Sequence, residues 1–153
     1  MIPKTHIILG FLATIIIYLV TPISQLEALI IFLSSFLIDV DHYLIYAITK
    51  KDTSLKNAKA YFHRRKKKWF SLTTKEQATY KRYIYFLHGI EAWIIIYILS
   101  LYHPLAIFIL YGFTIHMILD YIEFIQFKQP IIAKFSQLWV YETNKKKEHL
   151  TGY

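Results

Sequence analysis

Two long stretches without a single Lys or Arg constrain this chain more than any other feature. One covers residues 5–49 and the other covers residues 83–127, about 45 residues each. A transmembrane helix needs about 20 predominantly apolar residues, so each stretch has room for two crossings. Hydrophobic residues make up 56% of the sequence, above the usage of about 45–50% in soluble domains. The sequence therefore predicts an all-α, polytopic membrane protein with four transmembrane helices in an antiparallel bundle.

Local signals place the first two predicted helices. The first covers His6–Val20 and is closed by Thr21-Pro22. A signal peptide has a similar charged start and short apolar core, but no small-residue cleavage site follows, so a retained helix is preferred. Ser24 and Glu27 have the spacing of a capping box, which predicts a second helix from there to about Thr49.

The other two predicted helices are delimited in the same way. Thr73 and Glu76 form a second capping-box pattern, from which a third helix continues, apolar from Tyr83, to about His103. Pro104 suits the first turn of a fourth helix, which is expected to end near residue 127.

The cations give an orientation and a division of the chain. Lys and Arg crowd into residues 50–82 and into the tail from residue 128 onward. The positive-inside rule then places both termini and the 50–82 loop on the cytoplasmic side of the cell membrane. We expect a transmembrane domain over 1–127, including that basic loop, followed by an amphipathic interfacial helix and basic tail over 128–153.

The loop and the tail each suggest contact with a surface. Arg64–Lys68 is a run of five cations followed by Trp69-Phe70, which is typical of a segment that binds anionic lipid headgroups. Basic runs also bind nucleic acid, a less favoured partner here because membrane is adjacent. After Pro130, apolar residues share one face of an amphipathic helix, and residues 145–149 are expected to be a solvated tail. The sequence indicates no oligomeric state.

Ionisable residues inside the apolar stretches point to function. Asp39, Asp41 and His42 lie within four positions of each other in the second predicted helix. Such residues are costly in a membrane, by roughly 2.5–3.5 kcal/mol each on insertion scales, and they persist where they pair, bind an ion or carry out chemistry.

With four alternating helices, the ionisable residues fall in one layer near the cytoplasmic side. The members of this layer are His6, Asp39, Asp41, His42, His88, Glu91, His116, Asp120 and Glu123. His116 and Asp120 are four residues apart and share a helix face. Asp41 points away from Asp39 on a regular helix, so it joins the layer only through a local break or as a support behind a ligand.

This set of side chains favours a divalent metal. There is no cysteine, so a metal must be held by nitrogen and oxygen, which suits zinc first, with manganese and iron as alternatives. A metal held this way lowers the pKa of bound water and polarises a phosphoryl oxygen. Glu91 or Glu123 is then a candidate general base, and Glu91 and Asp41 are the candidate catalytic residues. A hydrogen-bonded His116–Asp120 pair without metal is the simpler alternative.

The order of these motifs resembles a known family. Thr5-His6, Asp39-Val40-Asp41-His42, Leu87-His88-Gly89-Ile90-Glu91 and His116-Met117-Ile118-Leu119-Asp120 together resemble the membrane-bound metal-dependent hydrolases of the YdjM type. The resemblance implies an integral membrane hydrolase with a divalent-metal site. Carried over by position, the functional set is His6, Asp39, Asp41, His42, His88, His116 and Asp120. The His-x-x-x-Asp element is also similar to one in zinc-dependent phospholipases C, which implies a phosphoester substrate.

One motif departs from the family pattern. The family often shows His-Arg-Gly-x-Thr-His-Ser around the third element, whereas the matching window here, Tyr83–Gly89, keeps only the second histidine, His88.

We therefore expect a metal-dependent hydrolase that cleaves a phosphoester of a lipid or amphiphile at the cytoplasmic leaflet. The alternatives are a metal-ion or proton transport or binding protein without hydrolytic activity, and a structural partner protein that docks through the basic loop.

Overall fold

The computed structural model describes residues 3–152, and its regular elements are helices. They are α1 Pro3–Val20, α2 Gln25–Leu37, α3 Val40–Lys50, α4 Leu55–Ser71, α5 Thr74–Thr79, α6 Ile90–Ser100, α7 Ala106–Gln126, α8 Ile132–Phe135 and α9 Gln137–Asn144. Residues 3–152 contain no β-strand, only one isolated bridge between Tyr80 and Glu148. The all-α prediction is confirmed.

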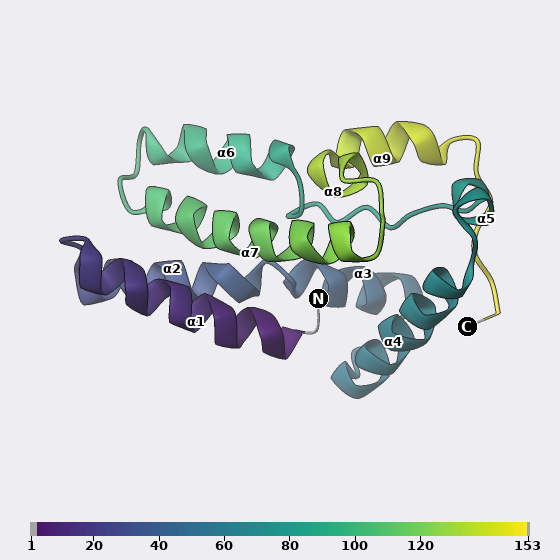
Figure 1. Cartoon of the computed structure of the whole chain (residues 1–153), viewed down its shortest axis with the longest axis horizontal. Helices are drawn as coiled ribbons and strands as arrows, with labels where there is room; N and C mark the ends of the chain where they lie inside the picture. Colours follow the sequence, from purple (N-terminus) through teal and green to yellow (C-terminus); the bar gives the residue numbers. More distant parts are fainter. Residues whose placement is uncertain (1–2, 153) are drawn as a thin grey trace.

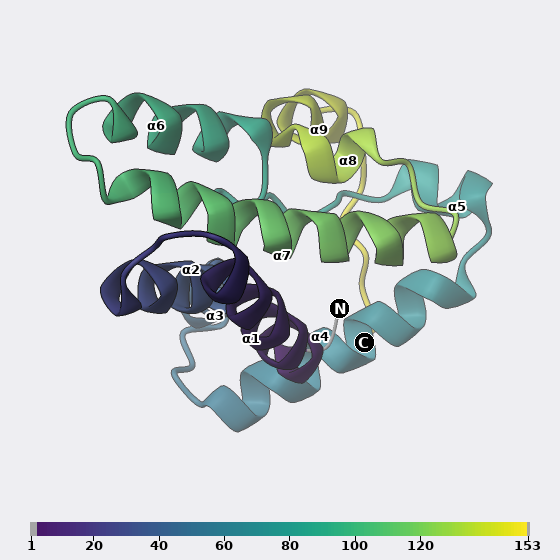
Figure 2. The ribbon, with the colours of Figure 1, turned by 60° about the vertical axis from the view of Figure 1, so that its left-hand side comes forward.

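Four apolar helices form a bundle at one end of the molecule (Figure 1). Helix α2 packs against α1 and most extensively against α7, and α6 packs along α7 on the side away from α1. Helix α3 continues α2, while α4, α5, α8 and α9 gather at the other end. Figure 2 shows α4 crossing beneath α7 at an angle. The site described below lies where these two ends of the molecule meet.

Two stretches, not four, are long and apolar enough to span a membrane. They are Gln25–Lys50 and Ala106–Gln126, with 28% and 33% of their most apolar windows buried inside the protein. Helices α1 and α6 are apolar but shorter than the length that the same criterion requires. Length and composition therefore support half of the predicted four transmembrane helices.

The second predicted helix is divided into α2 and α3. Its N-terminal capping box is confirmed, because Glu27 N donates to Ser24 Oγ and Ser24 N donates to Glu27 Oε2. At the other end of α2 the regular pattern stops. Asp39 N donates to Phe36 O at 3.2 Å, and His42 N donates to Asp39 O at 3.1 Å. These i→i−3 bonds tighten the chain locally and rotate α3 relative to α2.

The third predicted helix is wrong over its middle third. The capping box at Thr73 and Glu76 is present, but α5 ends at Thr79, residues 80–89 are not helical, and α6 begins only at Ile90. Polar partners from the C-terminal region stabilise this backbone. Tyr85 N donates to Gln137 Oε1 at 2.9 Å, and Arg82 N donates to Asn144 Oδ1 at 3.0 Å. Such long-range partners are invisible in the local sequence.

The C-terminal region is docked on the rest of the chain. The predicted amphipathic helix is two short helices, α8 and α9, and α9 packs against α6. The expected solvated tail is wrong for Glu148, whose carbonyl oxygen accepts from Lys81 N at 2.7 Å and whose N–H donates to Thr79 O at 3.0 Å. Residues 128–152 therefore close over the 80–89 segment.

The basic loop is largely helical. The run Arg64–Lys68 lies on α4, where Arg65, Lys66 and Lys68 bond to other parts of the chain and Arg64 and Lys67 are exposed. Binding of anionic headgroups by this run stays a prediction.

Candidate metal centre

Two imidazoles and two carboxylates from three segments, the α2–α3 break, residues 80–89 and α7, meet at one point. Nε2 of His88 lies 3.1 Å from Nε2 of His116. Asp39 Oδ1 lies 3.3 Å from His88 Nε2 and 3.7 Å from His116 Nε2. Asp120 Oδ2 lies 3.3 Å from His116 Nε2 and 3.8 Å from His88 Nε2. Each of these nitrogens therefore faces the other nitrogen and two carboxylate oxygens.

The opposite ring nitrogens fix which way the lone pairs point. His88 Nδ1 lies 3.0 Å from Asp41 Oδ2, and His116 Nδ1 lies 2.9 Å from the carbonyl oxygen of Ser35. Both oxygens are acceptors, so each Nδ1 carries the hydrogen and each neutral imidazole presents an Nε2 lone pair. When both imidazoles are neutral, two lone pairs and two carboxylate oxygens converge with no hydrogen between them, an arrangement that a cation stabilises.

The break at Asp39 makes the Ser35 carbonyl available. In a continuous α-helix Ser35 O would accept from the N–H of Asp39, four residues on. Here Asp39 N bonds to Phe36 O instead. The freed carbonyl oxygen orients His116 on α7. The same break brings both Asp39 and Asp41 to the centre, although residues two apart on a regular helix face in different directions.

Asp41 holds two histidines at once. Its Oδ2 accepts from His88 Nδ1 and from the backbone N–H of Leu87 at 3.0 Å, and its Oδ1 lies 2.8 Å from His42 Nδ1. The side chain is fully buried. A carboxylate behind a histidine fixes the ring and increases its basicity as a ligand. The structure thus gives Asp41 the supporting position that was one of the two sequence-based alternatives, reached through a break in the helix.

His6 and His42 lie on either side of the centre. The His6 ring stacks on the His116 ring at 4.1 Å, and His6 Nε2 lies 3.4 Å from Asp120 Oδ1. Neither ring nitrogen of the buried His6 has a hydrogen-bond partner among the described residues, an uncommon state for buried polar atoms that calls for an explanation. His42 stacks on Tyr85 at 3.7 Å, and its side chain is 26% exposed.

The donor set fits a divalent metal ion. Three overlapping groups place ligand atoms within 4.8 Å of one another: His6 with Asp39 and His116, Asp39 with His42 and His88, and His88 with His116 and Asp120. Tetrahedral zinc has ligand bonds of about 2.0–2.2 Å, which puts its ligand atoms about 3.3–3.6 Å apart. The distances of 3.1–3.8 Å around His88 and His116 match this spacing. The group can hold a metal ion, and its identity is open.

Lys134 is the residue at the centre that sequence reasoning missed. Its Nζ lies 2.6 Å from Asp120 Oδ2, and its side chain is 8% exposed. The signal was a single cation inside the apolar run Ile131–Phe135. The carboxylates of Asp39, Asp41 and Asp120 bring three negative charges to the centre, and within residues 3–152 Lys134 is the lysine in contact with them. Such a concentration of buried negative charge is stabilised by a divalent cation, because buried charges are unfavourable unless they are paired.

Two predicted participants lie elsewhere. Glu91 accepts from Ser136 Oγ at 2.6 Å, Gln137 N at 3.1 Å and Leu138 N at 3.0 Å, so its carboxylate joins α6 to the start of α9. Glu123 lies 2.8 Å from Lys66 Nζ on α4. These contacts argue against the general-base role proposed for Glu91 and Glu123, because both carboxylates are bound to helices outside the centre.

The 80–89 segment carries His88 into the centre. The carbonyl oxygen of His88 accepts from Gln137 Nε2 at 2.5 Å, which secures the segment from the α9 side. Tyr83 stands where the family pattern has its first histidine, and its hydroxyl bonds to that of Tyr61 on α4. That position therefore faces α4 and contributes no ligand to the centre.

Comparison of the chain with protein-family models, curated proteins and solved structures finds no match. The functional argument accordingly rests on the geometry of the centre.

Proposed function

We propose that this protein is a membrane-embedded, metal-dependent hydrolase that acts on a phosphoester of a lipid or amphiphile. The observation that carries the proposal is the pair of Nε2 atoms of His88 and His116, 3.1 Å apart, that face each other between two carboxylates. The resemblance to membrane-bound metal-dependent hydrolases of the YdjM type rests on the same residues and agrees with this reading.

The surface of the bundle supports a membrane location. Helices α1 and α6 expose rows of large apolar side chains, among them Ile16, Leu19, Ile95 and Ile98. The two longest apolar stretches are only about one-third buried or less, whereas core helices of soluble proteins are mostly buried. Apolar patches of this extent on a monomer mark a membrane or protein contact. In this proposal the cation-rich α4 and both termini face the cytoplasm, as the positive-inside rule requires.

Four residues would hold the metal: His88, His116, Asp39 and Asp120, with His6 as a further ligand. The chemistry supplied by such a metal, once bound, is a lowered pKa of its water and polarisation of a phosphoryl oxygen. Zinc fits the nitrogen and oxygen donors best, and manganese and iron remain alternatives.

The exposed side of the centre gives the direction of substrate approach. The side chains of Asp39 and His42 are 22% and 26% exposed, whereas those of His88 and His116 are fully buried. Asp41 binds His42 through Nδ1, which leaves Nε2 as the basic nitrogen. We assign His42 Nε2 the role of accepting a proton from the attacking water, with Asp41 orienting the ring. Lys134 would stabilise negative charge near Asp120.

Elemental analysis of detergent-purified protein tests the metal. We expect about one bound zinc or a similar divalent ion per chain, lost in His116→Ala and retained in His103→Ala, a substitution in the exposed turn between α6 and α7. A proton shared by His88 and His116 would satisfy the same geometry without metal. A metal-free wild type that binds no added zinc would therefore overturn the proposal.

Activity is tested on the same preparations with short-chain phosphatidic acid and a chromogenic phosphodiester. Chelation and His116→Ala should abolish turnover, and His42→Ala should reduce it by about 10²–10⁴-fold while metal content stays unchanged. Bound metal with no hydrolysis of any phosphoester would instead favour the transport or ion-binding alternative.

A further inference from the structure

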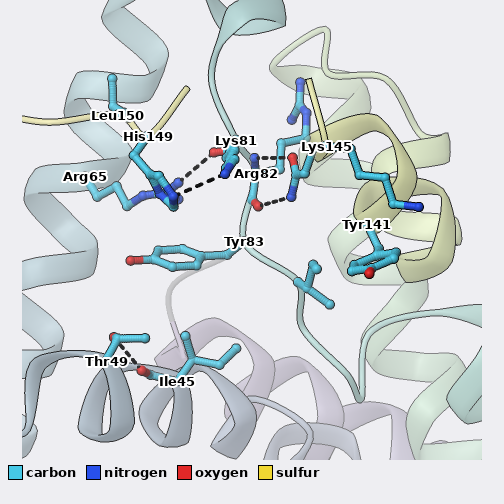
Figure 3. Close-up of a pocket in the computed structure, with 12 residues that line it drawn as sticks. Ile45, Thr49, Arg65, Lys81, Arg82, Tyr83, Tyr141, Lys145, His149 and Leu150 are labelled. Carbon is cyan, nitrogen blue, oxygen red and sulfur yellow. Dashed lines mark hydrogen bonds between the residues drawn. The ribbon is translucent and has the colours of Figure 1, made fainter. Parts of the chain in front are cut away.

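A second polar site lies outside the metal centre, under the docked C-terminal region. It is a cavity of about 460 Å³ between α3, α4, the 80–89 segment and residues 141–150 (Figure 3). Its volume is in the range of small-molecule sites. None of its lining residues belongs to the centre formed by His6, Asp39, His88, His116 and Asp120.

The lining of this cavity is strongly biased in charge. Arg65, Lys81, Arg82, Lys145 and His149 line it, and no Asp or Glu is among its lining residues, all of which lie in the described part of the chain. Lys145 pairs with the exposed Glu142. Lys81 and Arg82 have no carboxylate partner among residues 3–152. A concave surface lined by one sign of charge concentrates ligands of the opposite sign.

Three of these groups converge on one wall. Lys81 Nζ lies 3.2 Å from His149 Nε2, and the Arg65 guanidinium donates through Nη2 to the carbonyl oxygen of Lys81 at 3.2 Å. The same guanidinium lies 3.9 Å above the ring of Tyr83. Figure 3 shows Arg65, Lys81 and His149 pointing toward one another above that ring. Stacking fixes the guanidinium plane, and a fixed guanidinium fork matches the oxygens of a phosphate.

Arg82 adds to the positive potential. Burial, and then the nearby Arg65, lower the pKa of Arg82 to about 10. A half-buried guanidinium destabilised in this way gains from an anion nearby.

The lining of the cavity also includes apolar side chains. These side chains are Ile45 on α3, Ile84 in the 80–89 segment and Leu150 in the tail. The cavity therefore offers both cationic and apolar lining side chains to one ligand.

We propose that this cavity is a binding site for a phosphate group attached to an organic body, separate from the metal centre. The cations come from α4, the 80–89 segment and the C-terminal tail, and the bridge between Tyr80 and Glu148 holds two of these segments together. The site therefore exists only when the tail is docked. It does not rest on the proposed hydrolysis, since the ligand is recognised by its charge and not by the metal.

Binding is measured by calorimetry on the full chain in a zwitterionic detergent, after chelation of metal. The probes are dihexanoyl phosphatidic acid and inorganic phosphate, with dihexanoyl phosphatidylcholine as the neutral control. We expect dihexanoyl phosphatidic acid to bind, with or without binding of inorganic phosphate. We expect dihexanoyl phosphatidylcholine not to bind. Equal binding of the first two identifies a phosphate site, and a preference for the lipid of tenfold or more identifies a headgroup site. The proposal is overturned if neither binds below about 1 mM, an affinity typical of weak binding.

Matched variants locate the site. Thr49→Glu adds a carboxylate at an exposed position that lines the cavity, whereas Thr53→Glu adds one at an exposed position that does not line it. The double variant Arg65→Gln with Lys81→Gln removes two cavity cations, whereas Arg64→Gln with Lys67→Gln removes two exposed cations of the same helix. We expect at least about tenfold weaker binding in Thr49→Glu and in the first double variant, and less than about twofold change in the controls. Equal losses in both sets would show non-specific attraction and refute the site.

Discussion

The carbonyl oxygen of Ser35 accepts a hydrogen bond from His116 Nδ1 at 2.9 Å, although the two residues are on different helices. Ser35 is free to do so because the chain breaks regular α-helical bonding at Asp39, whose N–H turns to Phe36. One backbone irregularity thus sets the tautomer of a proposed metal ligand. Variants that disturb the contact between α2 and α7 should disturb the centre as well.

Gly112 on α7 lies directly against Ile31 and Ser34 on α2. A Cβ built there would lie 2.5 Å from the carbonyl oxygen of Ile31 and would also overlap Ser34 Oγ. Because the backbone oxygen has no rotamer to change, Gly112→Ala should cost about 1–3 kcal/mol and weaken zinc binding. Thermal unfolding in detergent and a zinc titration measure both effects.

Gly10→Ala is the matched comparison, because its Cβ would meet only the side chain of Ser35. A hydroxyl can rotate away, so the loss should be smaller than in Gly112→Ala. Equal losses in the two variants would contradict the role given to the Ile31 carbonyl.

Asp41 is expected to control metal affinity without touching the metal. Asp41→Asn keeps the size of the side chain but loses the charge that orients His88 and His42. Loss of such a carboxylate behind a histidine typically lowers metal affinity by about 10–100-fold. Zinc affinity is measured by competition with a chromophoric chelator. An unchanged dissociation constant would show that Asp41 only packs the interior, and Asp52→Asn serves as the control.

Lys134 and the metal should compete for Asp120. Lys134→Met removes the ammonium that lies 2.6 Å from Asp120 Oδ2. In the metal-free protein this removes a cation in direct contact with a buried carboxylate, at a cost of about 3–5 kcal/mol. With zinc present, removing the neighbouring positive charge should tighten binding by about tenfold or more.

Lys134→Met should lower the stability of the metal-free protein and tighten zinc binding. These effects have opposite signs, which distinguishes them from general damage to the fold. The variant should unfold at a lower temperature without zinc and regain most of the difference with zinc. Lys146→Met, at an exposed position, should change neither quantity. A loss of stability that zinc does not reverse would refute the competition.

Asp52 should make the turn between α3 and α4 sensitive to acid. Hydrogen bonds from Tyr46 Oη at 2.5 Å, Ser54 N at 2.8 Å and Asn57 Nδ2 at 2.9 Å lower the pKa of its carboxyl below the ordinary 3.8. A lowered pKa in the folded state adds stability above the unfolded value, and this stability is lost as pH falls through the folded value.

Asp52→Asn should therefore unfold at a lower temperature than the wild type at pH 7, and the gap should close below about pH 4. Glu142→Gln, which removes an exposed ion pair with Lys145, should show no such convergence. A gap that stays constant from pH 7 to pH 3 would assign the effect of Asp52 to something other than its charge.

The local sequence was sufficient to predict where a helix begins when that start depends only on neighbouring residues. The capping boxes at Ser24–Glu27 and Thr73–Glu76 are both present, because each needs only a side chain and a backbone group three residues apart. The local sequence did not predict the non-helical backbone of residues 80–89, because Gln137 and Asn144 supply its hydrogen bonds from about 50 to 60 positions away.

The candidate centre divides in the same way. The sequence by itself predicted that His6, Asp39, Asp41, His42, His88, His116 and Asp120 gather, because ionisable groups in apolar segments are costly unless they pair or bind an ion. Only the tertiary structure decided which role each of these residues has at the centre. It placed Lys134 on Asp120, turned Glu91 toward α9, and broke the helix at Asp39 so that Ser35 and Asp41 orient the two central histidines. Those outcomes depend on where separate segments pack, and spacing along one segment carries no record of its neighbours.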